Sequence, residues 1–209
     1  MPSVTRAAQT NRSDRREATE QRLFAATEEL VREGSFTEFS VERLAAAAGI
    51  SRSTFYVHFQ DKGDLVRKLS KTVLTQLREV SDRWWAVAEQ ADPTQLKAAV
   101  AAIVDIYRRH PAAFTAMSET ATYDPLVAEE LQATMRQIIA ATRAAIERGQ
   151  AAGVIRDVPP METAAALTWM VERTGYQMVR NTDPAGDATI VGVMTDIIWS
   201  TLYRTPADS

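Results

Sequence analysis

The chain has 209 residues, of which 45% are hydrophobic and 24% charged, and its formal net charge is −3 at pH 7. This length can bury the core of one large or two small domains. The chain contains no cysteine, which excludes structural disulfides and zinc-thiolate sites. Its first residues lack the apolar core of a signal peptide, and its longest apolar run is far shorter than a membrane span. We therefore expect a cytoplasmic protein without membrane contact.

The N-terminal segment is basic although the whole chain is acidic. The first sixteen residues carry four arginines against one aspartate, and the acidic excess lies further along the chain. We interpret residues 1–13 as a flexible basic arm, which either becomes ordered on nucleic acid or is simply disordered.

Proline and capping residues divide the rest of the chain into helices. Asp92-Pro93, Asp124-Pro125 and Asp183-Pro184 each place a capping aspartate before a proline at the first helical position. Long segments between them show none of the alternation of a strand. The predicted helices span 14–33, 41–48, 52–58, 62–90, 94–109, 111–120, 125–151, 160–181 and 187–204. We therefore expect an all-α fold of about nine helices.

Two short helices joined by a tight turn form the most informative stretch. Ser40 is placed to cap the helix over 41–48, and Gly49 is placed to end it in a left-handed conformation. Ser51 offers a second cap for the helix over 52–58. This spacing predicts a helix-turn-helix motif, whose second helix typically lies in the major groove of DNA.

The second helix of this motif has an apolar and a polar face. Phe55 and Phe59 are four residues apart and should pack inward. Arg52, Ser53 and Tyr56 fall on the other side, where arginine suits guanine edges and hydroxyls suit phosphates. The alternative is an ordinary helical hairpin with a solvated polar face. The predicted DNA-binding residues are Ser40, Ser51, Arg52, Ser53, Thr54, Tyr56, His58 and Lys62.

The same stretch resembles a known family. From about Glu20 to Leu69 the chain is similar to the DNA-binding domain of TetR-family transcriptional regulators. The residues that carry this resemblance include the run Leu44-Ala45-x-x-Ala48-Gly49-Ile50-Ser51-x-x-Thr54-Phe55-Tyr56-x-His58-Phe59-x-Asp61-Lys62. The later run Leu167-x-x-Met170-x-Glu172-Arg173-Thr174 resembles more narrowly the branch that contains the mycobacterial ethionamide-resistance repressor.

Two features fit the resemblance less well. Gly63 stands where the family usually carries an acidic residue, and a glycine there predicts a looser start of the helix. The net negative charge is unusual for a DNA-binding protein, but Arg52, Lys62, Arg67 and Lys68 cluster around the second helix of the motif. Few phosphate contacts per subunit are implied, so we expect the affinity to come from dimer symmetry and to fall steeply with salt.

The resemblance implies two domains, a helix-turn-helix DNA-binding domain over 14–68 and a helical ligand-binding and dimerisation domain over 69–209. It also implies a tunnel along the fourth, fifth, seventh and eighth helices. Aromatic and thioether side chains can line such a cavity, although each alone is ordinarily part of a core. The predicted ligand-binding residues are Trp84, Ile103, Tyr107, Phe114, Met117, Met135, Ile138, Thr142, Thr168, Trp169, Glu172 and Trp199.

Two charged residues interrupt the apolar pattern of the eighth predicted helix. Glu172 and Arg173 are neighbours and cannot pair neatly with each other, so each implies a partner elsewhere in the fold. A structural pairing is the expected role, and ligand sensing is the alternative. The last two predicted helices carry apolar residues on more than one face, so we place a homodimer interface there.

Enzyme chemistry has little support in this sequence. His58 and His110 are the only histidines, and neither has a nearby nucleophile or a metal-ligand spacing. We therefore expect neither a catalytic residue, a metal nor a cofactor. The expected partners are a double-stranded DNA operator, a small hydrophobic effector and a second copy of the chain. We therefore predict a repressor that binds a palindromic operator as a dimer and is released by the hydrophobic effector. The alternatives to this function are a DNA-binding activator or regulator without a ligand cavity, and an all-helical small-molecule carrier.

Overall fold

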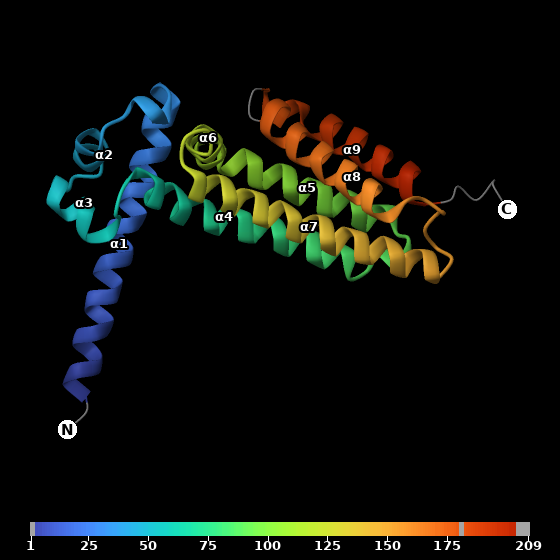
Figure 1. Ribbon diagram of the computed structural model, residues 1–209, viewed down its shortest axis with the longest axis horizontal. Helices are drawn as coiled ribbons and strands as arrows, with labels where there is room; N and C mark the ends of the chain where they lie inside the picture. The colour runs from blue at the N-terminus through green and yellow to red at the C-terminus, as the bar shows by residue number, and fades with distance from the viewer. Residues whose placement is uncertain (1–2, 180–181, 204–209) are drawn as a thin grey trace. The chain divides into compact units, whose positions relative to one another are not determined.

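The computed structural model describes residues 3–179 and 182–203, with side chains from residue 14 onward. These residues confirm the predicted all-α fold, because they contain no β-strand beyond one isolated bridge between Ile155 and Tyr203 (Figure 1). The α-helices are α1 (Ser3–Glu33), α2 (Val41–Ala47), α3 (Arg52–His58), α4 (Lys62–Trp85), α5 (Pro93–Arg109), α6 (Pro111–Thr120), α7 (Pro125–Ala151), α8 (Pro160–Thr174) and α9 (Asp187–Leu202). The short turns are η1 (Phe36–Glu38), η2 (Ala88–Gln90), the π-helical turn η3 (Gly175–Val179) and η4 (Pro184–Gly186).

The helices form two compact units that are not continuous in sequence. The first unit combines residues 1–71 with 112–128, and the second combines 72–111 with 129–209. A single boundary after residue 68 was expected from the sequence. The difference arises because α6 bonds to residues at η1, and Asp124, the residue before α7, contacts the start of α4.

The core of the first unit consists of aromatic and leucine side chains at helical spacing. Phe55 and Phe59 are fully buried on one face of α3, as their four-residue separation predicts. Leu23 of α1 and Leu44 of α2 are also fully buried, and Phe24 of α1 lies against Phe59 with the ring centres 6.2 Å apart. Burial of a side chain of this size contributes about 1.5–3 kcal/mol. The amphipathic pattern therefore fixes which face of α3 remains outside.

Capping residues set the turn between α2 and α3. The Ser40 side chain accepts a hydrogen bond from the backbone N–H of Arg43, and that of Ser51 accepts one from Thr54. Gly49 has φ +66°, a left-handed conformation that glycine adopts without the penalty of a side chain. The predicted helix-turn-helix is thus present, with both caps where the sequence placed them.

Two polar contacts attach α6 and the start of α4 to η1. Glu119 of α6 accepts a hydrogen bond from the Ser35 hydroxyl at 2.8 Å. Lys62, the first residue of α4, donates to the carbonyl oxygens of Phe36 at 2.9 Å and Thr37 at 3.2 Å. Burial lowers the pKa of Lys62, opposed by the nearby carboxylate of Glu119. These bonds explain why α6 belongs to the first unit.

The structure gives a packing reason for Gly63. A Cβ atom at this position would overlap the carboxylate of Asp124. Asp124 caps α7 by accepting from the backbone N–H of Leu126 at 2.9 Å, and one oxygen lies 3.6 Å from the Arg67 guanidinium. Glycine at position 63 therefore admits a close approach of the residue before α7 to the first turn of α4.

The second unit is built around α5 and α9, which pack along each other. Leu96 and Val100 of α5 and Leu202 of α9 are almost fully buried. An ion pair closes this contact at the end of α5, where the Arg108 guanidinium lies 2.5 Å from Asp187. The same guanidinium donates to the carbonyl of Thr182 at 2.8 Å, so it also fixes the loop before α9.

Three helix boundaries differ from the prediction. The first helix begins at Ser3, although residues 1–13 were interpreted as a flexible arm; their side chains lie outside the described residues. Helix α4 ends at Trp85 rather than at residue 90, and the chain turns through η2 to Ala91, which has φ +48°. Helix α8 ends at Thr174, where η3 replaces the predicted continuation as far as Val179; positions 180 and 181 of the predicted helix lie outside the described residues.

Gly175, the first residue of η3, packs closely against the side chain of Tyr107. The ring of Tyr107 lies directly against the backbone of Gly175, in the space that a Cβ would occupy. Gly175 itself has ordinary helical angles, φ −57° and ψ −49°, so its requirement for glycine is steric rather than conformational.

We predict that Gly175→Ala destabilises the protein although alanine is the better helix former by about 1 kcal/mol. The added methyl must displace the Tyr107 ring, and overpacking of this kind costs about 1–3 kcal/mol. Urea unfolding of the two proteins measures the difference. Gly186→Ala is the control, since nothing lies within 4 Å of a Cβ there. Equal effects of the two substitutions would contradict the steric argument.

Candidate DNA-binding face and ligand pocket

The outward face of α3 presents the residues that the sequence assigned to DNA. Arg52 and Ser53 are exposed, and Tyr56 exposes 47% of its surface. Val57 exposes 74%, more than any other large apolar side chain of this helix. A helix whose accessible surface offers a guanidinium, hydroxyls and a methyl-bearing side chain can contact base edges, phosphates and thymine methyl groups.

The Arg52 side chain is held in place across this face. Its guanidinium lies 2.7 Å from the Glu42 carboxylate of α2 and 5.7 Å from the centre of the Tyr56 ring. The interaction with Tyr56, followed by that with Glu42, raises the pKa of Arg52. Because both groups are exposed, the ion pair contributes little to stability and can be exchanged for a phosphate or a guanine.

The serine and threonine hydroxyls at the start of α3 form a cluster. The Ser51 hydroxyl lies 2.8 Å from that of Ser53 and 2.8 Å from that of Thr54. Ser51 and Ser40 each cap a helix, so their first role is to hold the turn. Ser53 is the exposed member that does not cap a helix, and its hydroxyl stays accessible to a phosphate.

His58 and Lys62 do not lie on this face, contrary to the sequence assignment. The His58 side chain is only 9% exposed, and its Nδ1 lies 3.7 Å from Glu20 of α1. Lys62 is committed to the carbonyl oxygens of η1. Their positions just after the polar residues suggested DNA contact, but His58 lies against Glu20 of α1 and Lys62 is bonded to η1.

Most cations of the predicted basic cluster are paired with groups of the same unit. Lys68 lies 2.6 Å from Glu20, and Arg67 pairs with Asp64 at 3.3 Å. Burial raises the pKa of Glu20, but hydrogen bonds from Lys68 and Arg16 outweigh it and hold the pKa below its usual value. Of the four cations counted in the sequence, Arg52 is therefore the one on the exposed face of α3.

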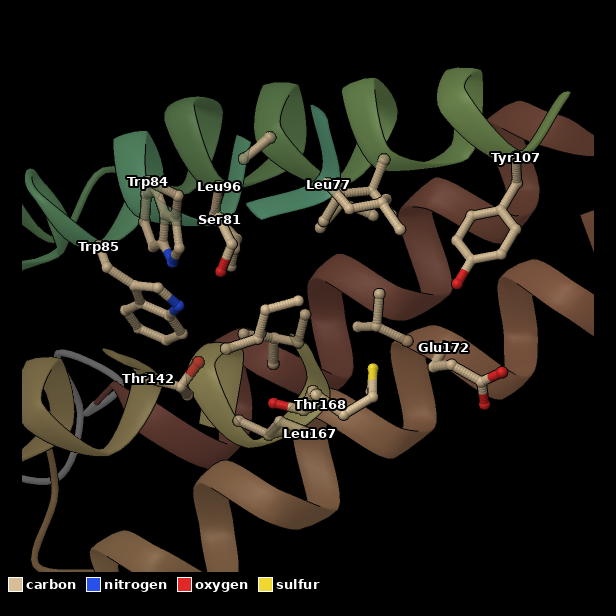
Figure 2. Close-up of a pocket in the computed structure, with 17 residues that line it drawn as sticks. Leu77, Ser81, Trp84, Trp85, Leu96, Tyr107, Thr142, Leu167, Thr168 and Glu172 are labelled. Carbon is tan, nitrogen blue, oxygen red and sulfur yellow. The ribbon is translucent and has the colours of Figure 1, made fainter. Parts of the chain in front are cut away.

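The second unit contains a pocket between its helices, shown in Figure 2. Eight of the predicted ligand-binding residues line it, namely Trp84, Ile103, Tyr107, Met135, Ile138, Thr142, Thr168 and Glu172. The lining also includes residues that the prediction omitted, namely Leu77, Ser81, Trp85, Leu96, Ala99, Val100, Leu167, Val171 and Ile198. Leu77, Ser81 and Trp84 recur at helical spacing on one face of α4, a signal that the sequence does contain.

Four of the predicted residues lie elsewhere. Phe114 and Met117 are buried on α6, within the first unit. Trp169 exposes 47% of its surface, because it sits one residue beyond Thr168 and so points about 100° away from the pocket. Trp199 stacks on Tyr203 with the ring centres 4.3 Å apart, while its neighbour Ile198 faces the pocket. The face of the helix on which a residue lies therefore predicts the pocket lining better than its residue type does.

Polar groups gather at two ends of this mostly apolar pocket. Trp84, Ser81 and Thr142 lie at one end, and Tyr107 and Glu172 lie at the other (Figure 2). The indole N–H of Trp84 is buried and has no hydrogen-bond acceptor among the described residues. A buried donor left without a partner costs about 1–3 kcal/mol, so a ligand that carries an acceptor here has an energetic advantage.

The Glu172 carboxylate is the charged group of the lining. Its Oε2 atom is buried without a hydrogen bond from any described residue, and burial raises its pKa, opposed by Arg173. The expectation that these neighbours could not pair was wrong in part, because the Arg173 Nε lies 3.6 Å from Oε2. Arg173 is exposed and stacks over Tyr176, so the pairing is weak and occurs at the surface.

The described residues contain neither a candidate metal site nor a candidate membrane span. The described residues contain no group of three or more histidine, aspartate or glutamate side chains that could hold a metal ion. None of the described helices is both long enough and apolar enough to cross a membrane.

The arrangement of a helix-turn-helix unit with a separate pocket-bearing helical unit is that of a DNA-binding transcriptional regulator. Residues 23–69 match the model for bacterial regulatory proteins of the tetR family. Residues 96–204, more than half of the chain, match the model for the C-terminal domain of the transcriptional regulator EthR. The chain therefore belongs to the TetR family of DNA-binding transcriptional regulators, in its EthR branch.

Known relatives agree with this assignment, and solved structures share the fold. The regulator EthR of Mycolicibacterium smegmatis is 29% identical over 98% of this chain and 93% of its own length. EthR of Mycobacterium tuberculosis H37Rv is 26% identical over 97% and 94%. The regulator PfmR of Thermus thermophilus shares the fold at a TM-score of 0.70 with 24% identity, covering 88% of this chain and 97% of PfmR. NalD of Pseudomonas aeruginosa also shares the fold. Its TM-score is 0.70 and its identity 19%, and the match covers 90% of this chain and 98% of NalD.

We predict that Glu172→Gln stabilises the ligand-free protein at neutral and alkaline pH. Because the folded protein raises the pKa of Glu172 above its ordinary 4.5, folding is favoured while this group is protonated, and that benefit is lost as the pH rises through the folded pKa. Glutamine has no such loss. Melting temperatures measured from about pH 8 downward should show an advantage for the variant that shrinks as the pH approaches 4.5.

The matched control for this measurement is Glu162→Gln, which changes an exposed carboxylate on the same helix. It should leave the pH profile unchanged. A Glu172→Gln variant that is less stable than the original protein at pH 8 would show instead that the carboxylate makes a net stabilising pair.

Proposed function

We propose that the protein is a ligand-released repressor that binds a palindromic operator as a homodimer. The observation that carries this proposal is the combination, in one chain, of an outward-facing polar surface on α3 and an apolar pocket that α4 helps to line. Among the fold neighbours, NalD is described as a repressor of a multidrug efflux pump, which supports the sign of regulation. The pocket favours this proposal over a regulator whose helical unit is completely filled.

A dimer provides the contact area that a single α3 lacks. This helix has seven residues, so one copy can reach only a few base pairs. Two copies related by a twofold axis read half-sites that are about 34–36 Å apart or a multiple of that distance. The operator is then an inverted repeat, and its affinity depends strongly on salt because phosphate contacts release counterions.

Exposed apolar side chains on α8 and α9 support dimerisation through these helices. Met161 and Trp169 of α8 are half-exposed, as are Val193 and Ile197 of α9. Val193 and Ile197 are four residues apart and share one face. Apolar residues gathered on a surface in this way mark interaction sites, and two such helices from each subunit would form a four-helix interface.

Helix α4 links the pocket to the DNA-binding unit along a single element. It begins at Lys62, four residues after α3 ends, and its residues Leu77, Ser81 and Trp84 line the pocket. A ligand that displaces this end of α4 would alter the position of α3 relative to its symmetry mate. A preference of about 3 kcal/mol for the displaced state would weaken operator binding by roughly two orders of magnitude.

We predict that Arg52→Ala and Tyr56→Ala each lower operator affinity about tenfold or more, since a side chain that contacts a base contributes about 1–3 kcal/mol. Fluorescence anisotropy with the DNA flanking the protein's own gene, compared with random DNA over a salt series, measures this. The control is Arg32→Ala, an exposed arginine of α1 that pairs with Glu29 at 2.6 Å. Unchanged operator binding in both α3 variants would rule out this face as the reading surface.

We also predict that Ile197→Glu converts the dimer to a monomer, because a carboxylate cannot be buried in an apolar interface without a partner. Sedimentation velocity measures the oligomeric state, and operator affinity should fall with it. Leu126→Glu is the control, since Leu126 is an apolar residue that is 61% exposed on α7. A dimer that survives Ile197→Glu would place the interface elsewhere.

A further inference from the structure

The residues that line the pocket include one carboxylate and no cation. Its lining from α4, α5, α7 and α9 consists of apolar, hydroxyl-bearing and indole side chains, and Glu172 of α8 is the residue that carries a charge at neutral pH. An ionised carboxyl group removed from water is costly unless a cation or hydrogen-bond donors replace the water. The negative charge of Glu172 therefore requires a cation or hydrogen-bond donors nearby.

Neighbouring side chains compensate Glu172 incompletely. Among the described residues, the titratable and charged groups that interact with it are Tyr107 of α5 and Arg173 on its own helix. The Arg173 Nε lies 3.6 Å from the buried Oε2, beyond hydrogen-bond distance, and its side chain is 62% exposed. Tyr107 stays protonated, because burial raises its pKa further above 10. Neither group supplies a buried positive charge.

A protonated amine matches this site. An ammonium group offers three N–H donors and a positive charge, and charge-assisted hydrogen bonds are about twice as strong as neutral ones. The apolar walls formed by residues such as Leu77, Ile103 and Ile138 would cover the hydrocarbon part of the same molecule. A carboxylic acid in this position would place a second negative charge beside the first.

We propose that the pocket selects a hydrophobic amine, with its ammonium nitrogen bound at Glu172 and its apolar body between the helices. The inference rests on the proposed function only in treating this pocket as the effector site. Glu172 is then the residue that determines specificity. The amine must reach the end of the pocket at which Tyr107 and Glu172 lie (Figure 2).

The test compares three probes of one size and shape, 4-phenylbutylamine, 4-phenylbutan-1-ol and 4-phenylbutanoate. Each is titrated by calorimetry into the full-length protein without DNA. We expect the amine to bind at least tenfold more tightly than the alcohol, and the carboxylate to bind more weakly than both. The amine should also lose affinity as the pH falls and Glu172 becomes protonated, while the alcohol should not.

Two variants assign the preference to one side chain. Glu172→Gln should weaken amine binding at least tenfold and leave alcohol binding unchanged, which also shows that the pocket is still folded. Glu162→Gln, on the exposed face of the same helix, should leave both unchanged. Equal affinity for amine and alcohol, or amine binding that survives Glu172→Gln, would overturn the inference.

Operator binding separates this inference from the proposed function. If the amine binds through Glu172 but leaves operator affinity unchanged, the ligand class is supported and the effector role fails. If none of the three probes binds while the operator is bound specifically, the inference is overturned and the DNA-binding function stands.

Discussion

The continuous helix α4 is the constraint on which the rest of the structure depends. Its first turn is fixed by Lys62, which donates to the carbonyl oxygens of η1, and by Gly63, which admits the Asp124 carboxylate. Its later turns present Leu77 and Trp84 to the pocket. The same helix therefore contributes residues to the DNA-binding unit and to the pocket of the second unit.

The pocket keeps polar atoms that do not contribute to the stability of the empty protein. Both the Trp84 N–H and the Oε2 atom of Glu172 are buried without hydrogen-bond partners among the described residues. Filling the same space with apolar side chains would remove this cost. Retaining it is consistent with a site in which a ligand completes the hydrogen bonds, and with specificity that comes from penalising ligands that cannot.

Predictions from local sequence patterns were correct for features that depend only on neighbouring residues. Ser40, Gly49 and Ser51 placed the turn correctly, because capping and left-handed geometry involve only neighbouring residues. Signals based on residue type alone did worse. Trp169 and Trp199 were expected in the pocket, but one helical step turns Trp169 to the surface and Trp199 onto Tyr203.

The sequence by itself determined the helical class, the helix-turn-helix and its resemblance to TetR regulators, since periodicity, caps and turn residues act over a few positions. Only the tertiary structure decided which cations remain free and which side chains share the pocket. Lys62, Lys68 and His58 are directed inward by helices that are distant in sequence. The presence of Glu172 and Tyr107 at the same end of the pocket likewise depends on how η3, which follows α8, packs on α5.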